Sequence, residues 1–121
     1  MKVIVFVKSV PEAEADVMPT RAELEEMGRF NDEMQKAGIM LTADGLTSTR
    51  HGSRISFGKG GGKPTVVDGP FAETKELVAG YWLLEVKSLD EAKEWMRRAP
   101  FKNGEMVELR PVMEIDESQL K

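Results

Sequence analysis

Two stretches of this chain are apolar at nearly every successive position, and they limit what it can fold into. Residues 3–7 read Val-Ile-Val-Phe-Val, and residues 79–86 contain the run Tyr-Trp-Leu-Leu. Since side chains of a strand alternate between the two faces of a sheet, each stretch predicts a strand that is apolar on both faces. One face can pack on helices of the same chain, whereas the other needs a second cover. An open apolar face of this size is rare in a monomer, so the sequence predicts a homodimer.

Two helices are predicted from their start and stop signals. Thr20 and Glu23 have the spacing of a capping box, and apolar residues then recur at helical spacing as far as Gly38, which fits a C′ glycine. Ser88 and Glu91 repeat the capping-box pattern before a second amphipathic stretch. We expect Pro100 to stop that second helix.

The remaining apolar segments predict strands and a hairpin. We expect strands at 39–43, 53–57, 65–68 and 105–110, an acidic loop at 11–19 and a polar tail at 116–121. Residues 53–57 and 65–68 would pair across the glycine-rich segment 58–63. Pro111 indicates that the last strand is an edge or that it breaks there. The order predicts a single α+β domain over residues 1–121. Its fold class is a ferredoxin-like βαββαβ sheet with an inserted β-hairpin.

The composition excludes several classes of protein. The chain has 17 basic and 21 acidic residues and no basic tract, which argues against nucleic-acid binding. No apolar run approaches the ~20 residues of a membrane span. The N-terminal apolar run is shorter than the ~7 residues of the shortest apolar region in a secretory signal peptide. The absence of cysteine excludes disulfides and thiolate chemistry and fits a reducing compartment. We therefore expect a cytoplasmic protein that binds neither nucleic acid nor membrane.

The densest set of charges follows the inserted hairpin, in the segment Asp-Gly-Pro-Phe-Ala-Glu-Thr-Lys-Glu at residues 68–76. Gly69 and Pro70 predict a tight turn that the Asp68 carboxylate could cap. The charges are either solvated around a structural turn or gathered at the mouth of a pocket. In the second case proton transfer would fall to the catalytic candidates Asp68, Glu73 and Glu76, and Lys75 could bind an anion.

Other candidate ligand-binding residues lie outside those charges. His51, the single histidine, is either an exposed loop residue or a proton-transfer group if the hairpin brings it near Asp68. Arg54 makes the hairpin locally basic, and Phe71 and Trp82 could line an apolar pocket. One histidine and no cysteine argue against a transition-metal centre, so we expect no metal or cofactor, although carboxylates alone could bind Mg²⁺ or Ca²⁺ weakly. The glycine-rich segment 58–63 lacks the spacing and the following helix of a phosphate-binding loop.

Residues 67–76, the strand opening Gly-Tyr-Trp at 80–82 and the helix opening at 88–92 resemble the signature of the DGPF-motif branch of the YCII-related family. The resemblance covers essentially the whole chain. It implies a ferredoxin-like fold that assembles as a dimeric α-β barrel, and it implies no known activity. Other YCII-like proteins carry a histidine on the first helix, paired with an acidic residue. The matching place here is at or near Met27, and this helix has no histidine, so that acid/base chemistry does not transfer.

Three hypotheses follow. The first is a small-molecule-binding or enzyme-like homodimer, with a pocket between the helices and the sheet that the hairpin closes and residues 68–76 floor. Proton transfer there would use Glu73, Glu76 or Asp68, with negative charge stabilised by Lys75 or Arg54. The second is a non-catalytic regulatory module that binds a protein partner such as an extracytoplasmic-function sigma factor, because genes of the DGPF branch often lie beside such factors. The third is a scaffold whose residues 68–76 only hold the dimer together.

Overall fold

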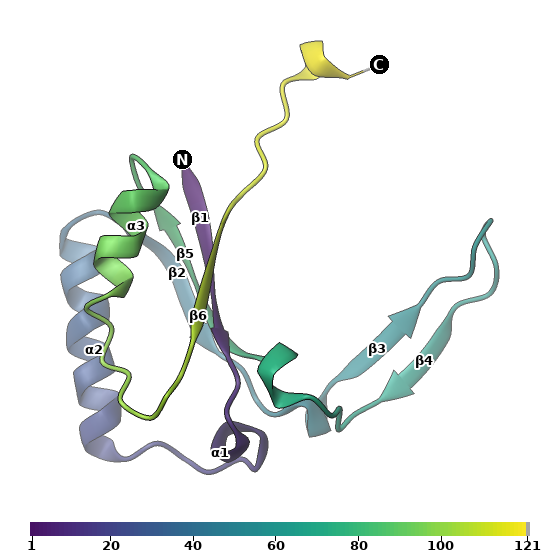
Figure 1. Cartoon of the computed structure of the whole chain (residues 1–121), viewed down its shortest axis with the longest axis horizontal. Coiled ribbons are helices and arrows are strands. Elements are labelled where there is room, and N and C mark those ends of the chain that lie inside the picture. Colours follow the sequence, from purple (N-terminus) through teal and green to yellow (C-terminus); the bar gives the residue numbers. More distant parts are fainter. Residues whose placement is uncertain (121) are drawn as a thin grey trace.

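The computed structural model describes residues 1–120, and Lys121, the last residue of the predicted polar tail, lies outside them. The elements are β1 Lys2–Lys8, α1 Pro11–Glu14, α2 Arg21–Lys36, β2 Met40–Gly45, β3 Ser53–Ser56, β4 Thr65–Asp68, β5 Val78–Glu85, α3 Leu89–Met96 and β6 Val107–Pro111 (Figure 1). Three single 3₁₀ turns are η1 Thr49–His51, η2 Thr74–Glu76 and η3 Glu117–Gln119. Among residues 1–120, every helix is too short or too polar to serve as a membrane span.

Four strands form one antiparallel sheet in the order β2-β5-β1-β6. Helices α2 and α3 both lie on one face of this sheet (Figure 1). The fold is therefore mixed α+β, with the β-α-β-β-α-β arrangement of the ferredoxin-like motif. Strand β6 is an edge of the sheet, as Pro111 predicts, because a proline there leaves no ladder hydrogen bond unmade.

Both predicted helices form, and their ends show which local signals hold. At the start of α2 the Thr20 hydroxyl accepts from the Glu23 N–H at 3.1 Å, and the Glu23 carboxylate accepts from the Thr20 N–H at 3.0 Å. Gly38 follows α2 with a φ of 73°, which a glycine adopts without strain. The second capping box was predicted wrongly in one half. The Ser88 hydroxyl accepts from the Glu91 N–H, but the Glu91 carboxylate accepts from the Lys87 N–H.

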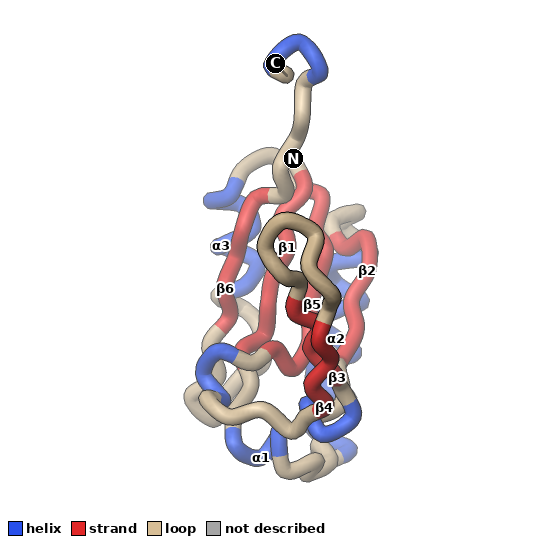
Figure 2. The backbone as a smooth tube through the Cα atoms, turned by 90° about the vertical axis from the view of Figure 1, so that its right-hand side faces the viewer, coloured by secondary structure: helices blue, strands red, loops and turns tan. Residues whose placement is uncertain are grey.

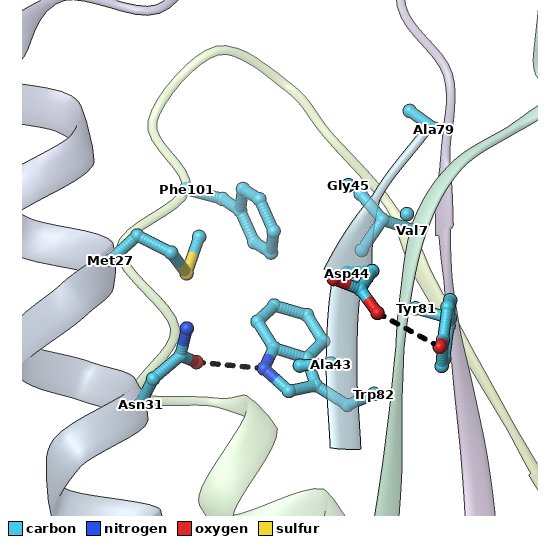
Figure 3. A pocket seen from close by; sticks show the side chains of 11 residues that line it. Val7, Met27, Asn31, Ala43, Asp44, Gly45, Ala79, Tyr81, Trp82 and Phe101 are labelled. Carbon is cyan, nitrogen blue, oxygen red and sulfur yellow. Dashed lines mark hydrogen bonds between the residues drawn. The ribbon is translucent and has the colours of Figure 1, made fainter. Parts of the chain in front are cut away.

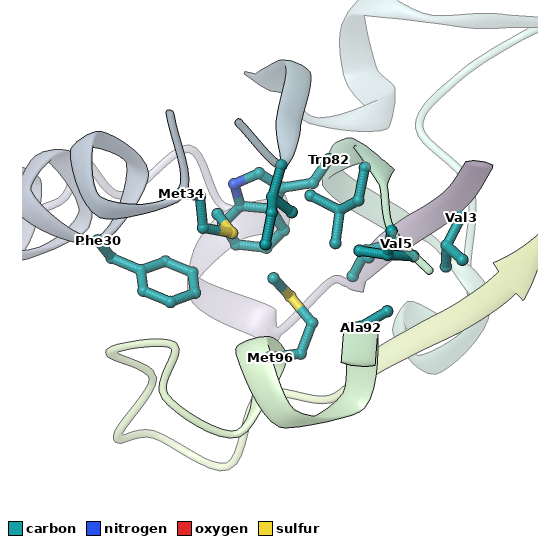
Figure 4. Packing of buried hydrophobic residues seen from close by; sticks show 10 residues of the cluster. Val3, Val5, Phe30, Met34, Trp82, Ala92 and Met96 are labelled. Atoms are coloured by element: carbon teal, nitrogen blue, oxygen red, sulfur yellow. The ribbon is translucent and has the colours of Figure 1, made fainter. Parts of the chain in front are cut away.

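The core lies between the helices and the sheet (Figure 4). On β1 and β5, Val3 pairs with Leu84 and Val5 with Trp82, so these four side chains share the face that the helices cover. The helices add the buried side chains of Phe30, Met34, Ala92 and Met96. Each fully buried aliphatic or aromatic side chain contributes about 1.5–3 kcal/mol of hydrophobic stabilisation.

The opposite face of the sheet is also apolar along its middle, as the two-faced strands predict. Ile4 pairs with Leu83 and Phe6 with Tyr81, and all four side chains are only half-buried. We call them the open face, because both long helices lie on the other side of the sheet (Figure 1).

Strands β3 and β4 form the predicted inserted hairpin, which we call the arm, residues 53–68. Within the described chain they pair with each other and not with the main sheet. The arm projects from the body on the side away from the helices, so that it stands in front of the sheet when that side is viewed (Figures 1 and 2). The residues of the arm are exposed.

Candidate functional site

A cavity of about 340 Å³ lies between α2 and the sheet, and we call it the helix–sheet cavity (Figure 3). This volume falls within the roughly 300–1,000 Å³ of small-molecule sites. The cavity is bounded by residues of β1, α2, β2, β5 and the segment after α3. They are Val7, Met27, Asn31, Ala43, Asp44, Gly45, Ala79, Gly80, Tyr81, Trp82 and Phe101.

Aromatic and thioether side chains form the apolar wall of the helix–sheet cavity. Trp82 is 4% exposed, and its ring lies edge-on to Phe30 and Phe101, with centroids 6.0 and 6.1 Å away. Met27 extends from α2 toward the same space (Figure 3). Edge-to-face aromatic contacts at this distance are stabilising and fix the plane of the indole. These contacts therefore hold the Trp82 indole in one orientation at the cavity.

Two polar contacts lie at the helix–sheet cavity, one on each face of the sheet. The Trp82 indole N–H donates to Asn31 Oδ1 at 2.8 Å, which turns the Asn31 amide nitrogen away from the indole and toward Met27 (Figure 3). The Tyr81 hydroxyl donates to Asp44 Oδ2 at 3.2 Å. Tyr81 and Asp44 are paired across β5 and β2, and their side chains share the open face, whereas Trp82 and Ala43 share the face toward α2. The polar group that the cavity offers to a ligand is therefore the Asn31 amide nitrogen, a donor.

Glycine at position 69 is required by a close approach between two backbones. A Cβ there would lie 1.8 Å from the Thr49 carbonyl oxygen. The Gly69 N–H donates to the Gly52 carbonyl at 2.9 Å, and the Phe71 N–H donates to the Thr49 hydroxyl at 2.9 Å. The predicted tight turn therefore holds η1 in place. The Asp68 carboxylate accepts from the Ser53 hydroxyl at 2.6 Å, so it closes the base of the arm instead of capping the Gly69–Pro70 turn.

Four of the predicted site residues, His51, Arg54, Phe71 and Glu76, meet in a second depression of about 340 Å³, which we call the motif cleft. The guanidinium carbon of Arg54 lies 3.9 Å from the centre of the Phe71 ring, a cation–π contact. His51 Nε2 lies 3.7 Å from Asp16 Oδ2. The carboxylate beside His51 is therefore Asp16, and not Asp68 as predicted.

The acidic segment after β1 fastens η1 through carboxylates, which sequence reasoning missed. Asp16 accepts from the Ser48 hydroxyl at 2.9 Å and from the Ser48 N–H at 3.3 Å. Glu14 accepts from the Thr49 N–H and hydroxyl, both at 2.7 Å. The hydrogen bond from the Ser48 hydroxyl lowers the pKa of Asp16, while desolvation opposes that shift. This segment was predicted as an acidic loop, but it contains α1, which begins at Pro11 as proline at a first helical position favours.

The remaining charged residues of the segment 68–76 face a larger groove of about 820 Å³. Glu73, Lys75 and Glu76 line it together with the end of β1 and residues 103–106. All three side chains are exposed. Glu73 has a φ of 62°, in the left-handed region.

The structure does not bring the predicted site residues into one pocket. Trp82 lines the helix–sheet cavity, and residues 68–76 do not floor that cavity as predicted. Glu76 lies between the motif cleft and the groove, because it lines both. Among residues 1–120, no group of three or more histidine or acidic side chains is placed to hold a metal ion. Sequence reasoning also missed Asn31 and Asp44. Asn31 gives no local signal, since its role depends on Trp82, a contact across 51 residues.

Comparison with known proteins gives three results. Residues 1–116 match the family model of the YCII-related domain. The uncharacterized protein R00369 of Rhizobium meliloti (strain 1021) is 53% identical over 36 residues, which are 30% of this chain and 29% of that protein. Among solved structures, 5-chloro-2-hydroxyhydroquinone dehydrochlorinase (TftG) from Burkholderia phenoliruptrix AC1100, in complex with 2,5-dihydroxybenzoquinone, gives a TM-score of 0.46 at 11% identity over 98% of both chains. At this likeness, the neighbour's reaction and ligand are properties of that protein alone.

Proposed function

The chain belongs to the YCII-related family, and we propose that it binds a small, planar, largely apolar molecule in the helix–sheet cavity. The observation that carries the proposal is the pairing of Trp82 with Asn31. It fixes a flat aromatic wall and a hydrogen-bond donor side by side in a cavity of ligand size. Ligand sites are typically apolar with a few oriented polar groups, which describes this cavity.

The polar group of the cavity defines the chemistry of the ligand. The Asn31 amide nitrogen would donate to an acceptor such as a carbonyl or phenolic oxygen. Asp44 is held by Tyr81 on the open face, so it takes no part in this recognition. The ligand is therefore a ring or conjugated system with a hydrogen-bond acceptor on its rim.

The absence of a histidine near this cavity bears on catalysis. Met27 lines the cavity at or near the place where the family resemblance puts a histidine, and a thioether does not carry a proton at neutral pH. Binding is therefore the activity we propose, without a stated reaction. Proton transfer by Glu73 or Glu76 stays a prediction for the groove and the motif cleft, and Asp68 is already engaged with Ser53.

We further propose that the protein is a homodimer of the dimeric α-β barrel type and belongs to the DGPF branch of its family. The support for a dimer is the open face, whose Ile4, Phe6, Tyr81 and Leu83 side chains form a continuous half-buried apolar stripe. A second copy of the sheet, packed about 10 Å away, would bury this stripe. The support for the branch is the sequence of residues 67–76.

A second candidate function is the regulatory module that binds a protein such as a sigma factor. The observation that favours it is the exposure of Glu73, Lys75 and Glu76, which leaves a charged surface free for a partner. The helix–sheet cavity favours the small-molecule function, because a protein-binding module needs no internal cavity.

Tryptophan fluorescence tests the small-molecule function. The chain has two tryptophans, so the W95F variant leaves Trp82 as the sole reporter, inside the cavity. We expect members of a panel of phenols, quinones and aromatic acids to quench its emission in a saturable way. The A43L variant, which fills the cavity, should abolish quenching. The N31D variant keeps the acceptor for the indole but removes the amide donor, so it should weaken binding about tenfold or more. Equal quenching in W95F and W95F/A43L would disprove the proposal.

Binding of a sigma factor would be tested separately. The charge-reversal variant K75E should weaken the complex while leaving Trp82 quenching intact, because Lys75 does not line the helix–sheet cavity.

A further inference from the structure

The arm is not stabilised by the body of its own chain. Its two strands pair with each other over four residue pairs, from Ser53 opposite Asp68 to Ser56 opposite Thr65. An isolated two-stranded hairpin is marginally stable at best in water, and stability normally comes from a further strand or from packing. The arm residues are exposed within the described chain, so packing must come from elsewhere.

One face of the arm is apolar. Ile55 lies opposite Val66 on one face, and Phe57 follows directly after the end of β3. They are 55%, 62% and 78% exposed in the order Ile55, Val66, Phe57. On the other face, Arg54 is anchored over the Phe71 ring at the root of the arm. An exposed apolar cluster on the strands of a projecting hairpin is typical of a contact surface.

The net charge of the arm is opposite in sign to that of the rest of the chain. The arm carries Arg54, Lys59, Lys63 and Asp68, a net charge of +2, and the whole chain carries −4, so the remaining residues carry −6. The arm is therefore attracted to a surface like the rest of this chain. Charge complementarity of this kind steers association and selects the partner.

The position and length of the arm fit the same partner. It leaves the body on the side of the open face, away from α2 and α3 (Figures 1 and 2). The eight residues from Ser53 to Gly60, at roughly 3.3 Å each, give a reach of about 25 Å. Packed sheets lie about 10 Å apart, so the arm extends beyond the sheet of a copy packed on the open face. In a two-fold dimer each copy receives the arm of the other.

We propose that the arm of each copy crosses to a second copy of this chain and buries the Ile55, Phe57 and Val66 side chains against its acidic body. This inference rests on the homodimer proposed above and specifies how the two copies are held together. The open face would supply the centre of the interface and the two arms its flanks.

Sedimentation equilibrium tests the role of the arm. The I55S/F57S/V66S variant should raise the dimer dissociation constant on the order of 100-fold, because three apolar side chains lose their cover. The V17S/M18S/L24S variant replaces three comparably exposed apolar residues outside the arm and is the matched control, expected to dimerise like the wild type. K59E/K63E should weaken dimerisation at low salt, with the effect fading as salt screens the charges. Circular dichroism should show an unchanged body in each variant.

The outcomes separate the arm from the dimer. A dimeric wild type whose dissociation constant is the same in I55S/F57S/V66S overturns the arm proposal and leaves the open-face dimer standing. A wild type that is monomeric at micromolar concentration overturns both.

Photo-crosslinking gives an independent readout. The protein is made with benzoylphenylalanine at position 57, and ¹⁵N-labelled and unlabelled copies are mixed in equal amounts. Crosslinking should then yield peptide pairs in which one peptide is labelled and the other is unlabelled. Crosslinks confined to peptides of the same copy would overturn the proposal.

Discussion

The main sheet and the arm are built from similar strands, yet the apolar side chains on one face of the sheet are buried and those of the arm are exposed. Val5 on β1 and Trp82 on β5 are buried under the helices, whereas Ile55 and Phe57 on the arm are exposed. Both regions have apolar residues at strand spacing, and both form regular antiparallel pairs. The difference shows that an apolar strand pattern predicts pairing but does not say which surface covers the apolar face.

Truncating one apolar side chain in each region tests this difference in burial most directly. Leu84→Ala, at a fully buried site, should lower the free energy of unfolding by about 2–5 kcal/mol, because it removes burial and leaves a cavity. Ile55→Ala should change the stability of the monomeric body by less than about 0.5 kcal/mol. Urea unfolding at a concentration that keeps the protein monomeric measures both. Equal losses would show that the arm packs on its own body.

The joint between the two regions gives the next largest effect. Gly69→Ala places a Cβ 1.8 Å from the Thr49 carbonyl, so the turn must move away from η1 at a cost of about 1–3 kcal/mol. The amide of Gly69, bonded to Gly52, should then exchange faster with solvent. Hydrogen exchange followed by NMR would detect this loss, and unchanged protection of the residue 69 amide would show that the turn has not moved away from η1.

Replacing a glycine of the main body, Gly28, should raise stability instead of lowering it. Gly28 lies inside α2, and a Cβ there would meet no atom within 4 Å. Gly28→Ala should therefore stabilise the protein by about 0.5–1 kcal/mol, since glycine is entropically costly in a helix. A rise in the midpoint of thermal unfolding checks this, and a fall would mean that this surface of α2 is covered in the native protein.

The smallest expected effect concerns the carboxylate that ties α1 to η1. The Ser48 hydrogen bond lowers the pKa of Asp16 in the folded state, so its stabilisation is present above the ordinary carboxyl pKa. It is lost as the pH falls below about 4 and through the lowered value. NMR should show faster exchange of the Ser48 amide below that pH. Asp16→Asn should remove this step, and a step that persists would exclude Asp16 as its source.

Much of the fold could be predicted because its signals are local. The capping box at Thr20 and Glu23, the glycine at position 38 and the edge proline at 111 each act within one turn or one strand. The helix α1 was missed because only four residues form it. The half-formed capping box at Ser88 shows the limit of such motifs, since the Glu91 carboxylate accepts from the Lys87 N–H and not from the Ser88 N–H.

The candidate site was harder to predict, because its contacts join distant parts of the chain. Trp82 was named from its residue type, but its partner Asn31 lies on another element. His51 was linked to Asp68 on the condition that the hairpin folds back, while the fold places Asp16 beside it. The density of charges in residues 68–76 predicted a functional site. The structure instead gives the motif a positioning role, through Gly69 and the Phe71 backbone.

The place of β1 in the sheet has a consequence for how the protein is made. This strand is central, and Val3 pairs with both Leu84 and Pro111. Its partners are therefore the last strands to leave the ribosome, and an apolar segment waits unpaired while most of the chain is translated. Folding dominated by such distant pairings is slow and exposes strand edges to aggregation. The first strand of the nascent chain therefore stays exposed to aggregation until β5 and β6 have been made.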